Sequence, residues 1–218
     1  MGSQSATGRA NQKLRTRTAI VQAAAELSRT GREVTMPEVA RTALVSEATA
    51  YRYFPDLLSL LREAIAGQLP TADEALRPVA DSPDPVERVA AATEFLLRHV
   101  LARQGVVRAM IAATVVRPAE AAARPGLRFG LIDHALAPLT ETSAVRPAAL
   151  DQLKHGLAVV VSAEALFNLT DLHGLAPEKA IASLVHTATT LTRAALRDVE
   201  HAESDAGPDA TAHPQTVA

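Results

Sequence analysis

The segment VSEATAYRYFPDLLSLL, residues 45–61, gathers hydroxyl and aromatic side chains in a pattern suited to gripping phosphate groups. Tyr51, Tyr53 and Phe54 are three of only six Tyr and Phe residues in the chain, and a hydrophobic core has no need to place half of them within four positions. Tyrosine carries a rigid ring with a polar tip, so it reaches a phosphate with little loss of side-chain entropy. The hydroxyl groups available in this segment belong to Ser46, Thr49, Tyr51 and Tyr53.

Helical spacing divides this segment into an outward and an inward face. On a helix over residues 47–54, positions three and four apart are neighbours, so Ala50 and Phe54 share the inward face and pack on the preceding helices. The outward face is left to meet a partner. It holds Glu47, Ala48 and Tyr51, with Ser46, Thr49, Arg52 and Tyr53 at its edges.

Two earlier helices are expected to support this one. The first spans residues 16–30 and ends at Gly31, where a helix needs a left-handed stop. Thr35 can cap a second, short helix, with Pro37 in its first turn and Glu38 completing a capping box. Two short helices joined by a tight turn, after a longer one, follow the helix-turn-helix plan.

The remainder of the chain also carries helical patterns, with no strand-like alternation, so the predicted fold is all-α. A three-helix helix-turn-helix domain comes first and a larger helical domain follows. Further helices are expected over residues 57–68, 85–102, 104–116, 127–139, 147–172 and 177–199. The predicted division is a disordered arm at 1–12, the helix-turn-helix domain at 13–67, the larger domain at 68–200 and a disordered tail at 201–218.

Charge is distributed unevenly along the chain. Residues 1–52 carry eight basic and four acidic side chains, a surplus of +4, although the whole chain has a net charge of −2. A basic end on an acidic body favours contact with a polyanion. On charge alone, a merely solvated basic tail is the alternative.

Composition and motifs argue against several other classes. The chain has no cysteine, no long apolar run and no apolar N-terminal signal, so we expect a cytoplasmic protein without disulfides or a membrane span. It has no glycine-rich phosphate loop, no serine elbow and no paired-histidine metal motif. We therefore expect no enzyme activity, no cofactor and no metal site.

The stretch RTRTAIVQAAAELSRTGREVTMPEVARTALVSEATAYRYFPDLLSLL resembles the DNA-binding domain of the TetR family of bacterial transcriptional repressors. The run VS…YRYFP follows TMPEVARTA at the family's distance, within about residues 14–65. The resemblance implies a homodimer that binds operator duplex and dissociates from it when a small molecule occupies the larger domain.

The resemblance also implies roles for individual residues. Thr35 and Pro37 start the helix that rests on the DNA backbone. The positions that enter the major groove are Ser46, Glu47, Ala48, Thr49 and Tyr51, beside Arg52, and Tyr53 has the position of a phosphate contact. Arg15 and Arg17 lie where a basic arm would reach the adjacent backbone or minor groove.

Three positions are unusual for the family. Leu44 stands where the family usually has glycine in the turn, so its backbone must tolerate or avoid a left-handed conformation. Leu57 replaces a lysine that often follows the FP pair, which removes one phosphate cation. Glu47 could accept a hydrogen bond from a cytosine amine or could stabilise the helix N-terminus, and the sequence leaves both roles open.

A ligand pocket is expected among the helices that begin at residues 85, 104, 127 and 147. Its candidate lining is Leu96, His99, Val100, Met110, Ile111, Thr114, Phe129, Ile132, Asp133, Leu157, Val161, Glu164 and Asn168. Glu164 and Asn168, four apart on the most apolar helix, are the strongest polar candidates. If Glu164 faces the pocket, the ligand should carry a cation or a hydrogen-bond donor.

The last two long helices predict how two subunits would pair. Their apolar stripes suit a four-helix bundle across a two-fold axis, although they could instead only close the core of one subunit. The predicted function is a ligand-responsive regulator, a repressor released from operator DNA by a small-molecule inducer. The alternative is a DNA-binding regulator without a ligand, an activator or architectural protein, which would lack an internal cavity.

Overall fold

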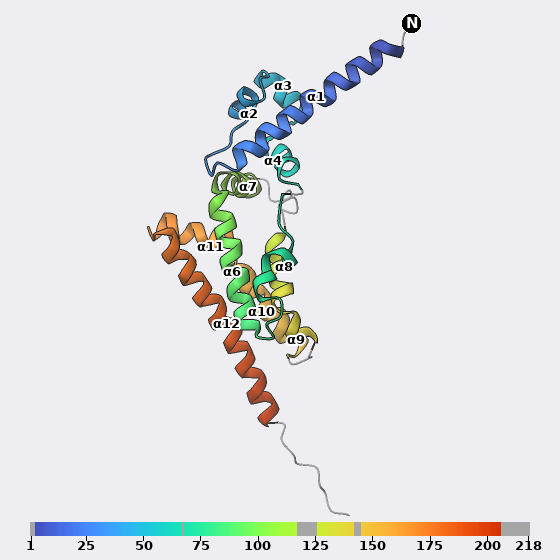
Figure 1. Ribbon diagram of the computed structural model, residues 1–218. Helices are drawn as coiled ribbons and strands as arrows, with labels where there is room; N and C mark the ends of the chain where they lie inside the picture. The colour runs from blue at the N-terminus through green and yellow to red at the C-terminus, as the bar shows by residue number, and fades with distance from the viewer. Residues whose placement is uncertain (1–2, 67, 117–125, 142–144, 206–218) are drawn as a thin grey trace, which may run out of the picture.

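The computed structural model describes residues 3–66, 68–116, 126–141 and 145–205, and within these ranges the protein is helical and has no strand (Figure 1). The predicted all-α fold is confirmed. The N-terminal domain contains α1 (Ser3–Ser28), α2 (Met36–Thr42), α3 (Glu47–Tyr53) and α4 (Leu57–Ile65). The larger domain contains α5 (Ala72–Leu76), a 3-10 turn (Arg77–Val79), α6 (Pro85–Ala102), α7 (Gln104–Val116), α8 (Leu127–Ala135), α9 (Ala137–Glu141), α10 (Pro147–Val160), α11 (Ala163–Phe167), a π-helical turn (Asn168–Leu172) and α12 (Pro177–Asp205).

Side-chain caps set where the N-terminal helices begin. Thr35 accepts a hydrogen bond from the amide of Glu38, and Asp56 accepts one from the amide of Ser59 at 2.8 Å. Gly31 ends the first helical segment with φ +69°, the left-handed stop that the sequence predicts. The helices then close over one apolar core, whose fully buried members include Ile20, Ala24, Val39, Ala50, Leu60 and Leu61.

The first helix is longer than its apolar pattern indicates. α1 begins at Ser3 and not near residue 16, so residues 3–12, predicted as a disordered arm, are helical. Those residues have little to bury, but they extend a helix whose later turns already pack in the core, so they avoid the cost of nucleation. In Figure 1 the start of α1 projects away from the other helices.

The last helix also extends past its predicted end. α12 runs to Asp205, into the segment predicted as a disordered tail, and residues 206–218 lie outside the described residues. α12 packs along α6 and against α10, which places it on the outer side of the larger domain (Figure 1). Its apolar side chains join those of the other helices in a core that includes Leu97, Leu131, Leu136, Leu157, Leu166 and Ala188.

Two predicted long helices are interrupted. The helix predicted over 127–139 breaks at Leu136 into α8 and α9. The helix predicted over 147–172 ends at Val160, because Ser162 adopts an extended backbone and its hydroxyl caps α11 by accepting from the Ala165 amide at 3.1 Å. A serine hydroxyl that offers the backbone a local partner competes with helix continuation, and periodicity alone does not register this.

A close backbone contact joins the two domains. α6 and α7 meet at 92°, and this corner lies against the loop after α1. A Cβ on Gly105 would lie 1.6 Å from the carbonyl oxygen of Arg32, so only glycine fits there. Val106 and Met110 of α7 then enter the core of the N-terminal domain. The packing thus crosses the predicted boundary at residues 67/68.

None of the described helices is by itself long and apolar enough to cross a membrane. Within the described ranges, one bent pair, α6 and α7 taken together, reaches that length and composition. In the structure both helices contribute buried side chains to the protein core, Leu97 from α6 and Val106 from α7 among them.

Candidate nucleic-acid interface and ligand cavity

Ser46 closes the N-terminus of α3. Its hydroxyl oxygen accepts from the Thr49 amide at 3.2 Å and donates to the Thr49 hydroxyl at 3.0 Å. Two of the four hydroxyls predicted to hold phosphate are therefore already bonded to each other. In the described part of the chain, the phenol groups of Tyr51 and Tyr53 hydrogen-bond to no protein atom.

The two faces of α3 lie as helical spacing predicts. Ala50 is fully buried and Phe54 is 3 % exposed. On the opposite face Glu47 and Ala48 are exposed, and the Tyr51 side chain is 48 % exposed. The outward face of α3 is therefore exposed on the surface and not packed into the core.

Tyr53 and Arg52 lie at the edge of that face. Tyr53 is half-buried against the N-terminal core, and the guanidinium of Arg52 lies 5.7 Å from its ring centroid. The ring thus packs against the core and lies beside the Arg52 guanidinium. Its hydroxyl is positioned by packing and not by a hydrogen bond within the protein.

Arg17 is less available than the resemblance implies. Its guanidinium makes a bidentate ion pair with the carboxylate of Glu63 on α4 and lies 4.8 Å from the centroid of the Phe54 ring. This pairing follows from the packing of α1 against α4. Arg15, two residues earlier, is exposed and has no ion pair among the described residues.

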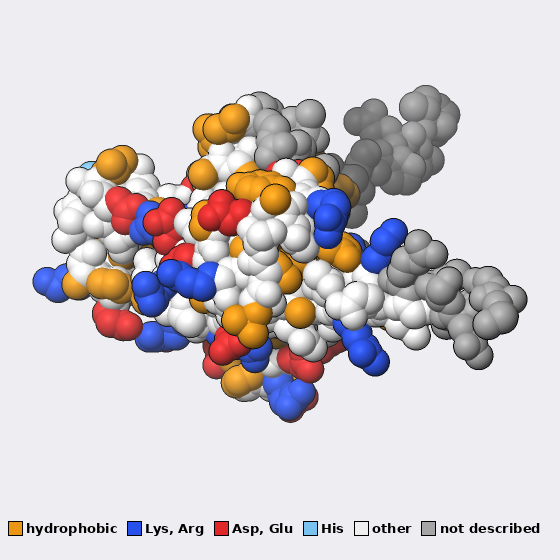
Figure 2. Space-filling model, turned by 90° about the horizontal axis from the view of Figure 1, so that it is seen from above, with side chains coloured by type: hydrophobic (Ala, Val, Ile, Leu, Met, Phe, Trp, Pro, Cys, Tyr) orange, Lys and Arg blue, Asp and Glu red, His pale blue; other side chains and the backbone are white. Residues whose placement is uncertain are grey.

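On the face of the molecule that Figure 2 shows, the Lys and Arg side chains do not form a single patch. Seen from the end that carries α1–α4, blue Lys and Arg side chains are spread among acidic and apolar ones (Figure 2). Part of the reason is pairing within the domain, since Arg41 also lies 3.7 Å from the carboxylate of Glu38.

The turn before α3 has a left-handed residue. Leu44 has φ +56°, and no other non-glycine residue in the described ranges has a positive φ. Its side chain is 92 % exposed. The chain thus tolerates the left-handed backbone at the position where the family usually has glycine, and the strain is not offset by burial.

The other predicted backbone contacts lie nearby. Thr35 caps α2 and its hydroxyl also donates to the Glu38 carboxylate at 3.3 Å. Pro37 is exposed in the first turn of α2. Leu57, which replaces a cation, is half-buried and packs against the N-terminal core.

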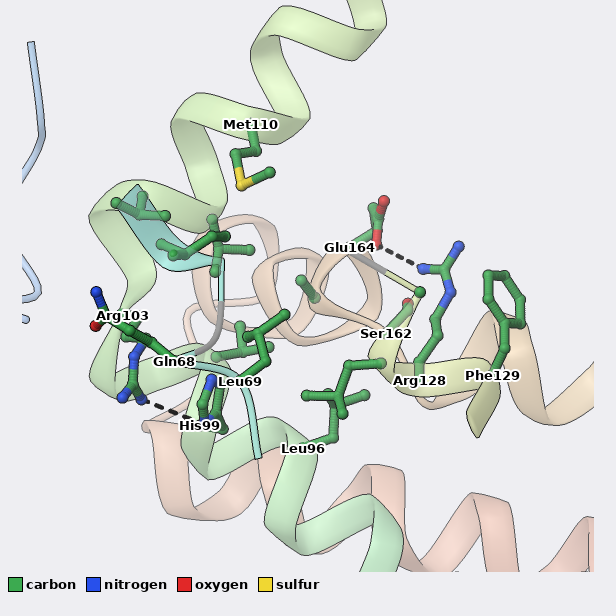
Figure 3. Close-up of a pocket in the computed structure, with 17 residues that line it drawn as sticks. Gln68, Leu69, Leu96, His99, Arg103, Met110, Arg128, Phe129, Ser162 and Glu164 are labelled. Carbon is green, nitrogen blue, oxygen red and sulfur yellow. Dashed lines mark hydrogen bonds and ion pairs between the residues drawn. The ribbon is translucent and has the colours of Figure 1, made fainter. Parts of the chain in front are cut away.

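A cavity of about 560 Å³ lies between the two domains (Figure 3). Its walls come from the end of α4 with the segment after it, from α6, α7 and α8, and from the start of α11. This volume is within the range of small-molecule sites, about 300–1,000 Å³. Most of the lining is apolar, contributed by Ile65, Leu69, Leu96, Val100, Val106, Val107, Met110, Leu127, Phe129 and Ala163.

The cavity contains some of the predicted lining residues and not others. Those that line it are Leu96, His99, Val100, Met110, Phe129 and Glu164. Those that do not are Ile111, Thr114, Ile132, Asp133, Leu157, Val161 and Asn168. Ile132, Leu157 and Val161 instead fill the core of the larger domain.

The polar members of the second group have other surroundings. Asp133 is exposed and pairs with Lys154 at 2.8 Å, and Asn168 is exposed. Thr114 is buried and donates to the carbonyl oxygens of its own helix. Ile111 packs at the edge of the core.

The residues that sequence reasoning missed come partly from the expected helices and partly from outside them. Ile65 belongs to α4, which the prediction assigned to the DNA-binding domain, and Arg103 lies at the corner between two helices. The other missed members are Gln68, Leu69, Val106, Val107, Gly126, Leu127, Arg128, Ser162 and Ala163. An arginine at the end of an apolar helix, as at 103, was the available signal. No three His, Asp or Glu side chains of the described residues gather closely enough to hold a metal ion.

His99 is neutral at the lower wall of the cavity. Burial, with a smaller contribution from the positive charge of Arg103, lowers its pKa to about 4. Nδ1 lies 3.2 Å from the Arg103 guanidinium, which can only donate, so Nδ1 accepts and the ring proton is on Nε2. Nε2 is buried and has no hydrogen-bond partner within the described ranges.

Charged side chains also lie at the far end of the cavity. Arg128 donates to the Glu164 carboxylate at 3.4 Å and its guanidinium lies 4.8 Å from the centroid of the Phe129 ring. Outside the cavity, Arg108 pairs with Asp171, which lowers the pKa of that carboxyl and raises that of the arginine. The same guanidinium lies 3.8 Å from the centroid of the Phe167 ring.

Comparison with known families decides what the N-terminal domain is. A family model described as bacterial regulatory proteins, tetR family, matches residues 20–64, from the middle of α1 to the end of α4. The N-terminal domain is thus a TetR-family DNA-binding domain. The chain is a DNA-binding transcriptional regulator. The comparisons with curated proteins and with solved structures found no match to this chain.

Proposed function

We propose that this TetR-family regulator is a cytoplasmic repressor that binds operator DNA as a homodimer and is released by a small-molecule inducer. The observation that carries the ligand response is the position of the cavity. Ile65 lines it, and the same helix α4 supplies Leu58, Leu60 and Leu61 to the core under the DNA-binding surface. An occupant that displaces Ile65 would act directly on the packing that orients α3.

The second wall of the cavity supports the same coupling. Val106 and Met110 of α7 line the cavity and also belong to the N-terminal core. A ligand in the cavity would thus contact both α4 and α7, the two helices that line the cavity and also contribute to the core of the DNA-binding domain. Because packed cores have discrete arrangements, a ligand that prefers one of them changes the population that binds DNA.

On DNA, the outward face of α3 would enter the major groove. Glu47, Ala48 and Tyr51 form that face, and Thr35 and Pro37 start the helix that would rest on the backbone. Tyr53, Arg52 and Arg15 would contact phosphates at its margins, with Ser46 and Thr49 holding the helix N-terminus toward the duplex. One such helix reads few bases, so specificity requires two half-sites.

Pairing of subunits would use the outer surfaces of α10 and α12. The side chains exposed on α12 are small or polar, among them Ser183, His186, Thr187 and Thr190. On α10, Val159 is 72 % exposed. A four-helix bundle of these helices across a two-fold axis would cover it.

Selection of bound fragments from random duplex DNA tests the regulator and the dimer together. The expected product is an inverted repeat whose half-sites lie about one helical turn, or a multiple of it, apart. Sedimentation at micromolar concentration should report a dimer. A single unrepeated site together with a monomer would contradict the homodimer.

Ligand release separates the proposal from a regulator without a ligand. A compound that binds the protein raises its thermal unfolding temperature, and it should also release the selected operator fragment. The reason is that a ligand that prefers one conformation of the protein lowers the population of the conformation that binds DNA. A compound that fills the cavity and leaves operator affinity unchanged would favour the ligand-free alternative.

A further inference from the structure

Arg103 is a charged cavity residue without an acidic partner among the described residues. It follows the last residue of α6, at the corner where α6 and α7 meet at 92°. Its side chain is half-buried and lines the cavity, and its guanidinium contacts the Nδ1 of His99 at 3.2 Å. A cation on an apolar wall without a counter-ion is costly to desolvate, so an anion there gains more than it would in water.

His99 orients this cation without neutralising it. Its ring is neutral and accepts from the arginine, so it adds no negative charge. It fixes one edge of the guanidinium and leaves the remaining donors for another acceptor. Gln68, in the same corner of Figure 3, donates its amide to the carbonyl oxygen of Ala64 at 2.5 Å and likewise brings no charge.

The opposite end of the cavity is different in charge. Figure 3 shows Arg128 and Glu164 together there, separated from the Arg103 corner by Leu69, Leu96 and Met110. Their charges offset one another across 3.4 Å. Among the described residues, three charged side chains line the cavity, and Arg103 is the one without an ion pair.

We propose that the cavity binds an amphipathic carboxylate, with its apolar body along the aliphatic walls and its carboxylate on the guanidinium of Arg103. The inference rests on the proposed ligand response and specifies the chemistry of that ligand. It reverses the charge expected from Glu164 alone, because Glu164 faces the cavity but shares its charge with Arg128. It also places the anion at the corner next to Gly105, which touches the DNA-binding domain.

Three probes with the same ten-carbon chain test the charge preference. Decanoate, 1-decanol and decyltrimethylammonium are titrated into the full chain by calorimetry, without DNA. Decanoate should bind about tenfold or more tightly than 1-decanol, the range for a charge-assisted hydrogen bond, and the cation should bind most weakly. Equal affinity for acid and alcohol, tighter binding of the cation, or no binding of decanoate would each overturn the proposal.

Variants then locate the preference. Arg103→Gln should bring the affinities for decanoate and 1-decanol together, and Arg103→Lys should retain part of the difference. Arg98→Gln is the matched control, because Arg98 lies on α6, close before Arg103 in the chain, but pairs with Glu178 and does not line the cavity. A preference that survives in Arg103→Gln, with its fold verified by thermal unfolding, would place the carboxylate elsewhere and refute the assignment.

The outcomes for ligand and regulator are distinguishable. If decanoate fails to bind but selection still yields an inverted repeat, the ligand chemistry is wrong and the regulator stands. If decanoate binds through Arg103 and no duplex is selected, the cavity assignment stands and the proposed repressor falls.

Discussion

At the scale of single residues, backbone conformation and side-chain chemistry conflict most at Leu44. A left-handed backbone costs an L-residue about 1–2 kcal/mol, and a leucine that is 92 % exposed recovers almost none of this by burial. The residue lies two positions before Ser46, which caps α3. The strain is therefore at the entry to the helix proposed to read DNA, where it can hold the start of that helix in one orientation.

Replacing Leu44 by glycine should stabilise the protein. Relief of the left-handed strain exceeds the extra chain entropy that glycine adds to the unfolded state, so we expect a gain of about 0.5–1 kcal/mol in the free energy of unfolding by urea. Leu44→Ala keeps the Cβ and is the control, with no gain expected. A glycine variant no more stable than the alanine variant would show that the turn is not strained.

Tyr51 should matter for DNA binding and little for stability. Its ring is 48 % exposed on the outward face of α3. Tyr51→Ala should lose about 1 kcal/mol per half-site, and so about 30-fold in operator affinity for a symmetric dimer, as measured by footprinting. Leu172→Ala, an equally simple truncation of an exposed side chain far along the chain, should leave affinity unchanged.

At the scale of elements, α7 is the part of the larger domain that most constrains the DNA-binding domain. Its first turn touches the loop after α1 backbone to backbone, and its apolar face enters the N-terminal core. Such a contact cannot adjust by rotating a side chain. The position of the α6–α7 corner therefore sets the position of α1 and α2.

A methyl group at Gly105 should separate these elements. Gly105→Ala places a Cβ on the Arg32 carbonyl, so we expect a loss of about 1–3 kcal/mol in unfolding free energy together with weaker operator binding. Gly130→Ala is the matched control in α8, where a Cβ meets nothing within 4 Å and should stabilise the helix by about 1 kcal/mol. Equal effects of the two substitutions would refute the close contact.

At the scale of the whole molecule, the protein combines a DNA-binding domain and a cavity through shared helices, while much of its basic charge is paired internally. Operator affinity should still fall linearly with salt on logarithmic axes, because phosphate contacts release counterions. The Arg17–Glu63 pair makes this testable at one site. If Arg17 were released from Glu63 and contacted phosphate, operator affinity would depend more steeply on the salt concentration.

Glu63→Gln should therefore increase the salt dependence of operator binding. Removing the carboxylate frees Arg17 in each subunit, and two further phosphate contacts per dimer steepen the slope by about 1.8. Glu33→Gln, which removes an exposed carboxylate of the same domain without an ion pair among the described residues, is the control. Identical slopes for the two variants would mean that Arg17 does not reach the DNA backbone.

Local signals in the sequence determined the helix-turn-helix and most of its boundaries. These signals involve neighbours within four residues, so they can be predicted from the sequence. They are the caps at Thr35, Ser46 and Asp56, the stop at Gly31 and the spacing of Ala50 and Phe54. The start of α1 was missed because it depends on packing elsewhere in that helix. The break at Ser162 was missed because a hydroxyl there caps α11.

The cavity was decided by tertiary structure. Two of its charged lining residues are Arg103 and Arg128, and one wall comes from Ile65 and Leu69, which precede the helices where a pocket was expected. Periodicity identifies which face of a helix is apolar but not which apolar face is opposed by another and which is left open. Pairing is likewise a property of the fold: Glu164 and Arg128 are 36 positions apart, and their contact leaves Arg103 as the charged lining residue without an ion pair in the described part of the chain.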